Sequence, residues 1–130
     1  MEKQVWQSPQ YDKMGMTQWF WRVTHRERFI LGSNVEIGSF TMIDAQEGVT
    51  IEDDVKIGFG CAILSHSSID NRSGPIKLRK ACNVGAHTVV MPGVEIGENA
   101  TVGANSVAIH NIPANEIWLG SPAKFVRKVK

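Results

Sequence analysis

The sequence predicts an all-β fold, a parallel β-helix wound from short strands, and three observations indicate it. An aliphatic residue recurs every six positions through most of the chain. A small or medium side chain usually stands two residues before it, and glycine often follows it. One short strand and one tight turn take up six residues, and three such units form a triangular coil of about 18 residues. An amphipathic helix would need a period of about 3.6 residues, and a β-sandwich would show alternation broken by irregular turns.

The repeat is unbroken in the second half of the chain, where its aliphatic positions are Leu78, Val84, Val90, Ile96, Val102 and Ala108. The residues two places before the last five are Cys82, Thr88, Val94, Ala100 and Ser106. The first half has the same rhythm, at Leu31, Ile37, Ile43, Ile51, Ile57 and Ile63. Only one large side chain per face fits inside so narrow a prism, so both sets of residues are predicted to point inward.

Two steps break the period and mark where the coils carry extra residues. From Ile43 to Ile51 the step is eight residues, which predicts a bulge or a widened corner at 45–50. From Ile63 to Leu78 the step is fifteen residues, which predicts an inserted loop at 65–77. Solenoids usually place insertions on one face, often the working face, so this polar loop is the first candidate for chemistry.

The repeat divides the chain into three parts, with the β-helix domain at 30–119. Residues 1–29 lack the repeat and are rich in aromatic side chains. They are expected to cover the open first coil or to contact a neighbouring chain, with substrate binding or membrane-surface binding as the alternatives. Thr17 offers a cap for a short helix through Arg28. Residues 120–130 are basic and form either a solvated tail or an anion site.

Composition limits the classes of protein that fit. A chain of 130 residues suits one domain, and 14 Lys and Arg against 13 Asp and Glu give a net charge of +1,. This balance argues against nucleic acid as a partner. No apolar stretch is long enough for a membrane span, and residues 1–10 are too polar for a signal peptide. Cys61 and Cys82 fall on inward positions, so reduced thiols and a cytoplasmic location are expected.

Several motifs from Ser65 onward resemble those of the maltose and galactoside O-acetyltransferases. The run Ser65-His66-Ser67-Ser68-Ile69-Asp70 resembles their T-H-P-x-D segment. The stretches at 84–86 and 91–97 resemble their I-G-x and P-G-V-x-I-G pieces, and the sequences G-A-x-S, I-P-x-N and G-S-P-A-K stand at 103–106, 112–115 and 120–124. The resemblance spans about residues 31–128, and it places the chain close to the hexapeptide-repeat acyltransferases.

This resemblance implies a left-handed β-helix that assembles as a homotrimer, with acetyl-coenzyme A in a groove between neighbouring prisms and no metal. The implied reaction moves an acetyl group to a hydroxyl or amine of a sugar or nucleotide-linked sugar. His66 matches the histidine that removes the acceptor's proton. Chemistry favours the same residue, because a neutral imidazole with a pKa of about 6.5 suits a general base near neutrality.

The other three histidines have weaker predicted roles. His87 occupies an outward position in a regular coil and is a candidate to line the cofactor groove, or an ordinary surface residue. His110 falls where the family often has Lys and is a weaker candidate to approach the cofactor. His25 lies outside the repeats, and the sequence gives it no role.

The cofactor positions follow the family's pattern residue by residue. Small residues that allow close approach of the pantetheine arm are Gly85, Ala86, Gly103 and Ala104,. The cations that match those of the family at the nucleotide phosphates are Lys124 and Arg127,. Asn83 stands where the family commonly has Trp, so one aromatic wall of the groove is missing.

The acceptor side is less well defined by the resemblance. Asp44 and Gln46 lie on the widened corner and are candidates to hold acceptor hydroxyls; the alternative is an ordinary polar turn. Asp70 and Arg72 are candidates to orient His66 or to bind substrate; the alternative is a local ion pair that pins the loop.

Two other functions compete with acyl transfer. A γ-class carbonic anhydrase-like metal hydratase would need two histidines five residues apart, whereas His66, His87 and His110 are 21 and 23 residues apart,. A non-catalytic trimeric scaffold would keep the prism without the chemistry. The inserted loop and the G-S-P-A-K segment argue against it.

Overall fold

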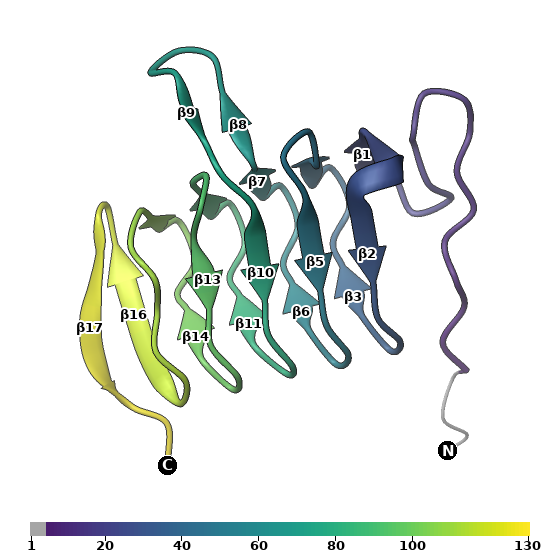
Figure 1. The fold of residues 1–130 in the computed structure, drawn as a ribbon. Coiled ribbons are helices and arrows are strands. Elements are labelled where there is room, and N and C mark those ends of the chain that lie inside the picture. Colours follow the sequence, from purple (N-terminus) through teal and green to yellow (C-terminus); the bar gives the residue numbers. More distant parts are fainter. Residues whose placement is uncertain (1–4) are drawn as a thin grey trace.

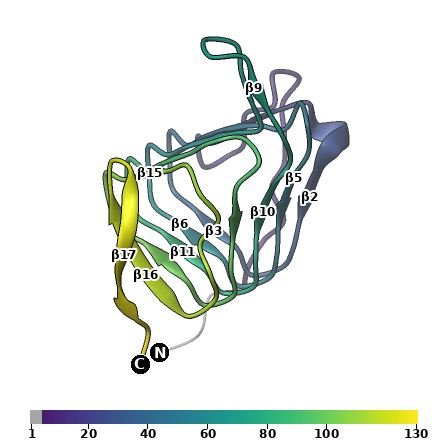
Figure 2. The same cartoon turned by 60° about the vertical axis from the view of Figure 1, so that its left-hand side comes forward.

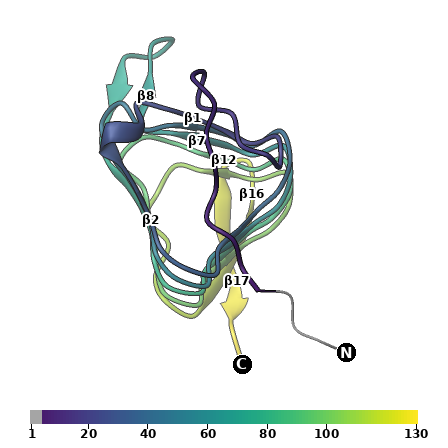
Figure 3. The ribbon, with the colours of Figure 1, turned by 90° about the vertical axis from the view of Figure 1, so that its right-hand side faces the viewer.

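Residues 5–130 of the computed structural model are described here, and they form a triangular prism of stacked coils (Figure 1). Each of the first four coils contributes one short strand to each of three sheets, and these strands run parallel within a sheet. Seen along the prism, the coils superpose into a triangular outline (Figure 3). The six-residue period of the sequence therefore corresponds to one side of the triangle.

The first sheet contains β1 (Arg22–Thr24), β4 (Met42–Asp44), β7 (Ala62–Leu64), β12 (Val89–Val90) and β15 (Val107–Ala108). The second contains β2 (Phe29–Leu31), β5 (Val49–Ile51), β10 (Ile76–Leu78) and β13 (Glu95–Ile96). The third contains β3 (Glu36–Ile37), β6 (Lys56–Ile57), β11 (Asn83–Val84), β14 (Thr101–Val102), β16 (Glu116–Gly120) and β17 (Ala123–Lys128).

The predicted inward positions form the core. Ile43, Ile63 and Val90 stack in register on the first sheet, and each is almost completely buried. The residues two places earlier are also buried, including the small Cys82 and Ala100. Leu31 and Ile37 are only half-buried, because they belong to the first coil at the end of the prism.

The turns between sheets stack into columns, and two of these columns contain most of the predicted site residues. Corner 1–2 leads from the first sheet to the second, at 25–28, 45–48, 65–75 and 91–94. Corner 3–1 leads from the third sheet to the first, at 38–41, 58–61, 85–88 and 103–106. A strand of the first sheet therefore runs from corner 3–1 to corner 1–2.

The segment before the repeats differs from the expectation of a short helix from Thr17 to Arg28. Thr17 is buried in a turn where its hydroxyl donates to the Trp21 carbonyl (2.9 Å), and β1 follows. The only helical residues there are the single 3-10 turn η1 (Arg26–Arg28). The helix prediction was wrong because β1 pairs in register with β4 and extends the first sheet by one coil.

The aromatic residues of this segment pack against the first coil. Trp21 is buried and makes edge-to-face contacts with Tyr11 and Phe29. The Trp6 indole donates to the Val35 carbonyl (2.8 Å). The chain before β1 therefore lies across the open end of the prism (Figure 3).

The basic C-terminal segment is an antiparallel strand, not a free tail. β17 pairs with β16, and β16 pairs with β14 of the third sheet. This hairpin lies at the end of the prism opposite the N-terminal segment (Figures 1 and 2).

Candidate active site

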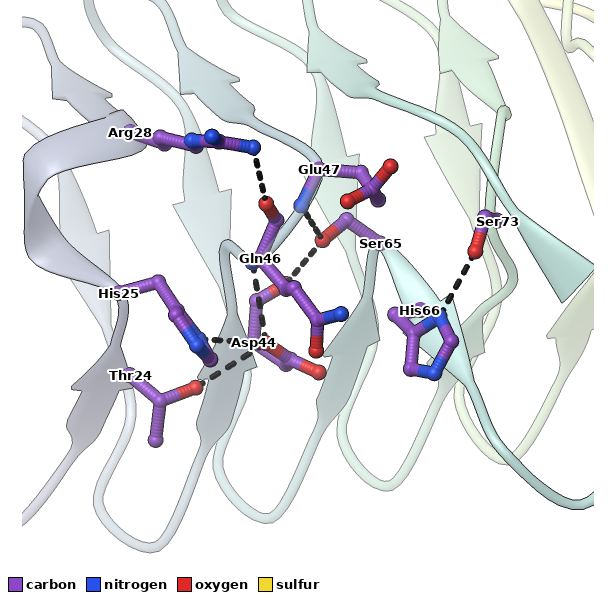
Figure 4. Close-up of polar contacts among 9 residues, drawn as sticks. All are labelled: Thr24, His25, Arg28, Asp44, Gln46, Glu47, Ser65, His66 and Ser73. Carbon is purple, nitrogen blue, oxygen red and sulfur yellow. Dashed lines mark hydrogen bonds and ion pairs between the residues drawn. The ribbon is translucent and has the colours of Figure 1, made fainter.

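Extra residues collect at corner 1–2 in three consecutive coils. The step from Val23 to Leu31 is eight residues, the same as from Ile43 to Ile51, and the third insertion follows Ile63. Parallel register aligns Thr24 with Asp44 and Asp44 with Leu64, so the three insertions begin at equivalent positions in successive coils. They form one polar wall, which we call the corner 1–2 site (Figure 4).

The third insertion is a β-hairpin, where a loop was expected. β8 (His66–Ser67) pairs antiparallel with β9 (Arg72–Ser73), and the hairpin projects from the prism (Figures 1 and 2). Its register places His66 directly opposite Ser73. His66 is half-buried at the root of the hairpin, and its Nδ1 lies 2.7 Å from the Ser73 hydroxyl oxygen (Figure 4).

This contact gives the imidazole a defined orientation. A serine hydroxyl can accept a hydrogen bond from a protonated Nδ1, and the neutral ring then has its lone pair on Nε2. Sequence reasoning found His66 but not Ser73, because the partner depends on the hairpin register. Ser73 is seven residues away, beyond the range of a local motif.

The root of the hairpin is fixed by the buried side chain of Ser65. Its hydroxyl donates to the Asp44 carbonyl (2.7 Å) and accepts from the Glu47 amide (2.9 Å). Its own carbonyl accepts from the Gly74 amide (2.9 Å) on the returning strand. Ser65 thereby links both ends of the hairpin to the coil below, so His66 is attached to a rigid base.

Asp44 and Gln46 lie on the same corner as His66. Asp44 Oδ1 accepts from the Gln46 amide (3.0 Å) and the Thr24 hydroxyl (3.1 Å), and His25 Nδ1 lies 3.4 Å away. The Arg28 guanidinium donates to the Gln46 carbonyl (2.9 Å). The first two insertions are thus joined by polar contacts. The repeat did not predict a place for His25 in the site, because its first recognised position is Leu31 and the eight-residue step from Val23 to Leu31 precedes it.

Asp70 and Arg72 lie on the outer part of the hairpin, where both are exposed. None of the ion pairs found in residues 5–130 joins them, so the alternative of a loop-pinning ion pair is wrong. The hairpin is held by the β8–β9 pairing.

The expected cofactor residues meet at corner 3–1. Register aligns Gly85 with Gly103 and Ala86 with Ala104, because the strands before them pair in parallel. A Cβ on Gly85 would clash with the Ala104 backbone nitrogen. The absence of a side chain at Gly85 therefore lets the two turns pack in close contact. Ala86 is half-exposed and Ala104 is exposed. The corner therefore presents small side chains and accessible backbone.

Both expected cations lie on β17, with Lys124 next to this corner and Arg127 farther along the strand, opposite Ile117. A Cβ on Gly103 would meet Leu119 at 2.9 Å, and Leu119 pairs with Lys124. Lys124 and Arg127 are both exposed on the same strand. The structure brings the small residues and Lys124 to one end of the third sheet.

The floor of corner 3–1 is a column of buried polar side chains. The hydroxyls of Thr41 and Thr88 donate to the carbonyls of Gly58 and Gly103 (3.0 Å each), and the Cys61 thiol lies 3.2 Å from the Gly85 carbonyl. Burial raises the pKa of Cys61, and burial with the nearby Glu52 carboxylate raises the pKa of Cys82 to about 12. Both are free thiols, and these pKa values keep them protonated near neutrality.

His87 and His110 do not join His66. His87 is exposed at corner 3–1, where its ring packs edge-to-face against Phe59 with 5.1 Å between ring centroids. His110 is exposed after β15. Residues 5–130 contain no group of three or more His, Cys, Asp and Glu side chains placed to hold a metal ion. Within the same range, no helix has the length and apolar character needed to cross a membrane.

The first sheet separates His66 from the cofactor residues within one chain. His66 follows β7 at corner 1–2, whereas Gly85 and Ala86 precede β12 at corner 3–1. The outer face of the sheet is apolar over β7, β12 and β15 and at Met42, with Ala62, Leu64, Val89 and Val107, whereas its β1–β4 edge also carries Arg22, Thr24 and Asp44. The outer faces of the other two sheets carry charged and polar residues, among them Lys77, Glu95, Glu36 and Lys56.

Two protein-family models match the chain. The hexapeptide repeat of succinyl-transferase matches residues 29–65, and the bacterial transferase hexapeptide of six repeats matches residues 75–109. These ranges are the two regular stretches on either side of the hairpin. The match confirms the resemblance to hexapeptide-repeat proteins.

A curated relative is the serine acetyltransferase of Buchnera aphidicola (subspecies Schizaphis graminum), which is 32% identical over 100 residues. The match covers 77% of this chain but only 38% of the relative's own length. The chain thus spans well under half of that enzyme.

Two solved structures share the fold. A hexapeptide-repeat acetyltransferase from Vibrio cholerae, complexed with acetyl-coenzyme A, superposes with a TM-score of 0.78 at 24% identity, covering 85% of this chain and 65% of that one. A maltose O-acetyltransferase from Clostridium difficile gives a TM-score of 0.71 at 21% identity, covering 85% of this chain and 64% of that one. The expected left-handed parallel β-helix is confirmed.

Proposed function

The chain is a hexapeptide-repeat protein, and on that premise we propose that it transfers an acetyl group from acetyl-coenzyme A to a hydroxyl or amine of a sugar or nucleotide-linked sugar. The observation that carries the proposal is the His66–Ser73 pair at the root of the hairpin. It orients a half-buried imidazole with Nε2 unengaged, on a wall of polar groups.

His66 acts as the general base in this proposal. Acetyl-coenzyme A, when bound, supplies a thioester carbon that an oxygen or nitrogen nucleophile can attack. His66 Nε2 takes the acceptor's proton as the new bond to the acetyl carbon forms, and it returns that proton to the sulfur as the carbon–sulfur bond breaks. Ser73 keeps Nδ1 engaged through the cycle, and it accepts a hydrogen bond from the imidazolium.

Corner 3–1 has the properties that coenzyme A binding needs. Ala86 and Ala104 present accessible backbone that can pair with the amides of the pantetheine arm, and Gly85 and Gly103 let their turns pack closely,. Lys124 and Arg127, both on β17, supply positive charge for the phosphates of coenzyme A,. The acetyl-coenzyme A named for the Vibrio cholerae structure supports this choice of donor.

The separation of His66 from corner 3–1 supports a homotrimer with shared sites. Because the apolar face of the first sheet lies between the two corners, packing that face against another copy would bring His66 of one chain toward corner 3–1 of the next,. A cyclic trimer would then have three equivalent sites. We also propose the cytoplasm as its location, since both thiols are free and buried,.

Asp44 and Gln46 are the proposed acceptor-binding residues nearest to His66 along corner 1–2. Asp70 and Arg72 are proposed to contact the outer part of the acceptor from the hairpin. The maltose O-acetyltransferase with the same fold supports a sugar as acceptor.

The test is release of coenzyme A thiol from acetyl-coenzyme A with a panel of sugars, amino sugars and nucleotide-linked amino sugars. We expect His66→Ala to lower kcat by about 10²- to 10⁴-fold, the usual contribution of general-base catalysis. Ser68→Ala is the matched control, because it changes an exposed residue of the same hairpin that has no proposed role in the site. Undiminished activity in His66→Ala would exclude His66 as the base. Absence of thiol release from the wild-type trimer with every acceptor would favour the scaffold alternative.

A further inference from the structure

His25 and Asp44 form a second histidine pair on corner 1–2, apart from the proposed His66–Ser73 pair. His25 Nδ1 lies 3.4 Å from Asp44 Oδ1 (Figure 4). The register from Thr24 to Asp44 to Leu64 places this pair along the same wall as the root of the hairpin. Gln46 follows Asp44 by two residues, as His66 follows Leu64, so both lie near the start of neighbouring insertions. The pair is therefore continuous with the proposed site.

The contacts of Asp44 leave one side of its carboxylate available. Its Oδ1 accepts from the Thr24 hydroxyl and the Gln46 amide as well as facing His25. In the part of the chain that the structure describes, no hydrogen bond or ion pair is found on Oδ2 or on His25 Nε2. Two acceptor atoms, Asp44 Oδ2 and His25 Nε2, thus remain on the same corner as His66.

A purely structural role explains this pair poorly. The side chains are 46% and 27% exposed for His25 and Asp44, and a polar contact so open to water stabilises a fold little,. Asp44 would remain in place without His25, because the Thr24 hydroxyl and the Gln46 amide would still donate to its Oδ1.

We propose that His25 Nε2 and Asp44 Oδ2 bind the acceptor, and that they select a ligand with neighbouring hydroxyl or amine donors. This inference rests on the proposed acetyl transfer at His66. With the proton of a neutral His25 on Nδ1, the nitrogen 3.4 Å from Asp44 Oδ1, His25 Nε2 accepts a hydrogen bond, as do Asp44 Oδ2 and His66 Nε2,. Three acceptors on one wall fit the several O–H groups of a sugar.

The same wall disfavours an anionic acceptor. A carboxylate ligand such as that of serine would face the Asp44 carboxylate, and like charges at close range repel. The chain therefore differs in its expected acceptor from the serine acetyltransferase that it resembles in sequence.

The test combines steady-state kinetics with a binding measurement on the full-length protein. The variants are His25→Ala, His25→Asn and Asp44→Asn, assayed with the best sugar of the panel and with L-serine. Asn readily adopts the left-handed backbone of His25 (φ 60°, ψ 51°), and its amide can replace Nδ1 beside Asp44, but it has no atom at the Nε2 position,.

We expect each variant to raise the KM for the sugar about tenfold or more, with the KM for acetyl-coenzyme A and the thermal midpoint unchanged. Recovery of the wild-type KM in His25→Asn would overturn direct contact by His25. An unchanged KM in His25→Ala, or a preference for L-serine in the wild type, would overturn the inference while leaving the proposed function intact.

A measurement without turnover separates the two failures. Calorimetric titration of the same sugar into His66→Ala with coenzyme A present should show binding, and the double variant His25→Ala/His66→Ala should bind at least tenfold more weakly. Equal binding by the two variants would overturn the inference. If the wild type shows no activity but its sugar binding depends on His25, the proposed acetyl transfer is overturned and the inference about His25 stands.

Discussion

Replacement of Ser65 by alanine tests whether the hairpin root is as rigid as its contacts indicate. The Ser65 side chain is fully buried, and its hydroxyl makes two hydrogen bonds, one to the Asp44 carbonyl and one from the Glu47 amide. The Asp44 carbonyl retains the Ser65 amide as a donor (3.0 Å), so only the Glu47 amide loses its partner. One lost hydrogen bond of about 1 kcal/mol and one unpaired amide of about 1–2 kcal/mol give an expected destabilisation of about 2–3 kcal/mol.

The assay is urea unfolding followed by tryptophan fluorescence, at one protein concentration because oligomerisation contributes to apparent stability. Ser68→Ala is the matched control, since Ser68 is exposed on the same hairpin and should change stability by less than about 0.5 kcal/mol,. We also expect Ser65→Ala to lower kcat, because His66 follows directly on the loosened residue. A free energy of unfolding equal to that of the control would refute the reasoning.

Three further perturbations test separate parts of the structure. Ser73→Ala should lower kcat about tenfold and alter the pH dependence of kcat, with Ser73→Thr restoring both; an unchanged pH profile would contradict the orienting role of the Nδ1 contact,. The Cys82 thiol has its usual pKa of 9.0 in the unfolded chain but a pKa of about 12 in the folded protein, so its contribution to stability is complete below pH 9 and is lost as pH rises,. The free energy of unfolding of the wild type should therefore fall by about 1.4 kcal/mol per pH unit above pH 9. Cys82→Ala should not show this fall. Parallel slopes of unfolding free energy against pH in the two proteins would argue against this assignment. Gly85→Ala should cost about 1–3 kcal/mol because the new Cβ meets the Ala104 backbone, whereas Ala104→Ser, at an exposed position, should be nearly neutral in the same denaturation assay,.

The repeat predicted most of the fold because a narrow prism fixes the size of every inward side chain. Ile43, Ile63 and Val90 are buried as their spacing required. The first coil was less predictable: Val23 belongs to the same column, but its eight-residue step to Leu31 lies among aromatic residues that conceal the period. The possible cap at Thr17 suggested a short helix there, and the pairing of β1 with β4 outweighed that local signal.

The site was predictable where it depends on chain order and unpredictable where it depends on register. His66 could be found because it begins the longest insertion and matches a family motif. Ser73 could not, because its place opposite His66 follows from the β8–β9 pairing. His25 comes to Asp44 only because two insertions stack in adjacent coils.

The central claim is that His66 of one chain works with corner 3–1 of a neighbouring chain, and mixing two inactive variants tests it most directly. His66→Ala removes the base, and Ala104→Trp fills the proposed cofactor groove at an exposed position. The two variants are refolded together in equal amounts to give randomly mixed trimers. A site is intact only when its His66 comes from an Ala104→Trp chain and its corner 3–1 comes from a His66→Ala chain, which has a chance of about one in four. Thiol release should therefore recover to about a quarter of the wild-type rate. Recovery at that level would support the shared site. Mixed trimers as inactive as the separate variants would contradict it.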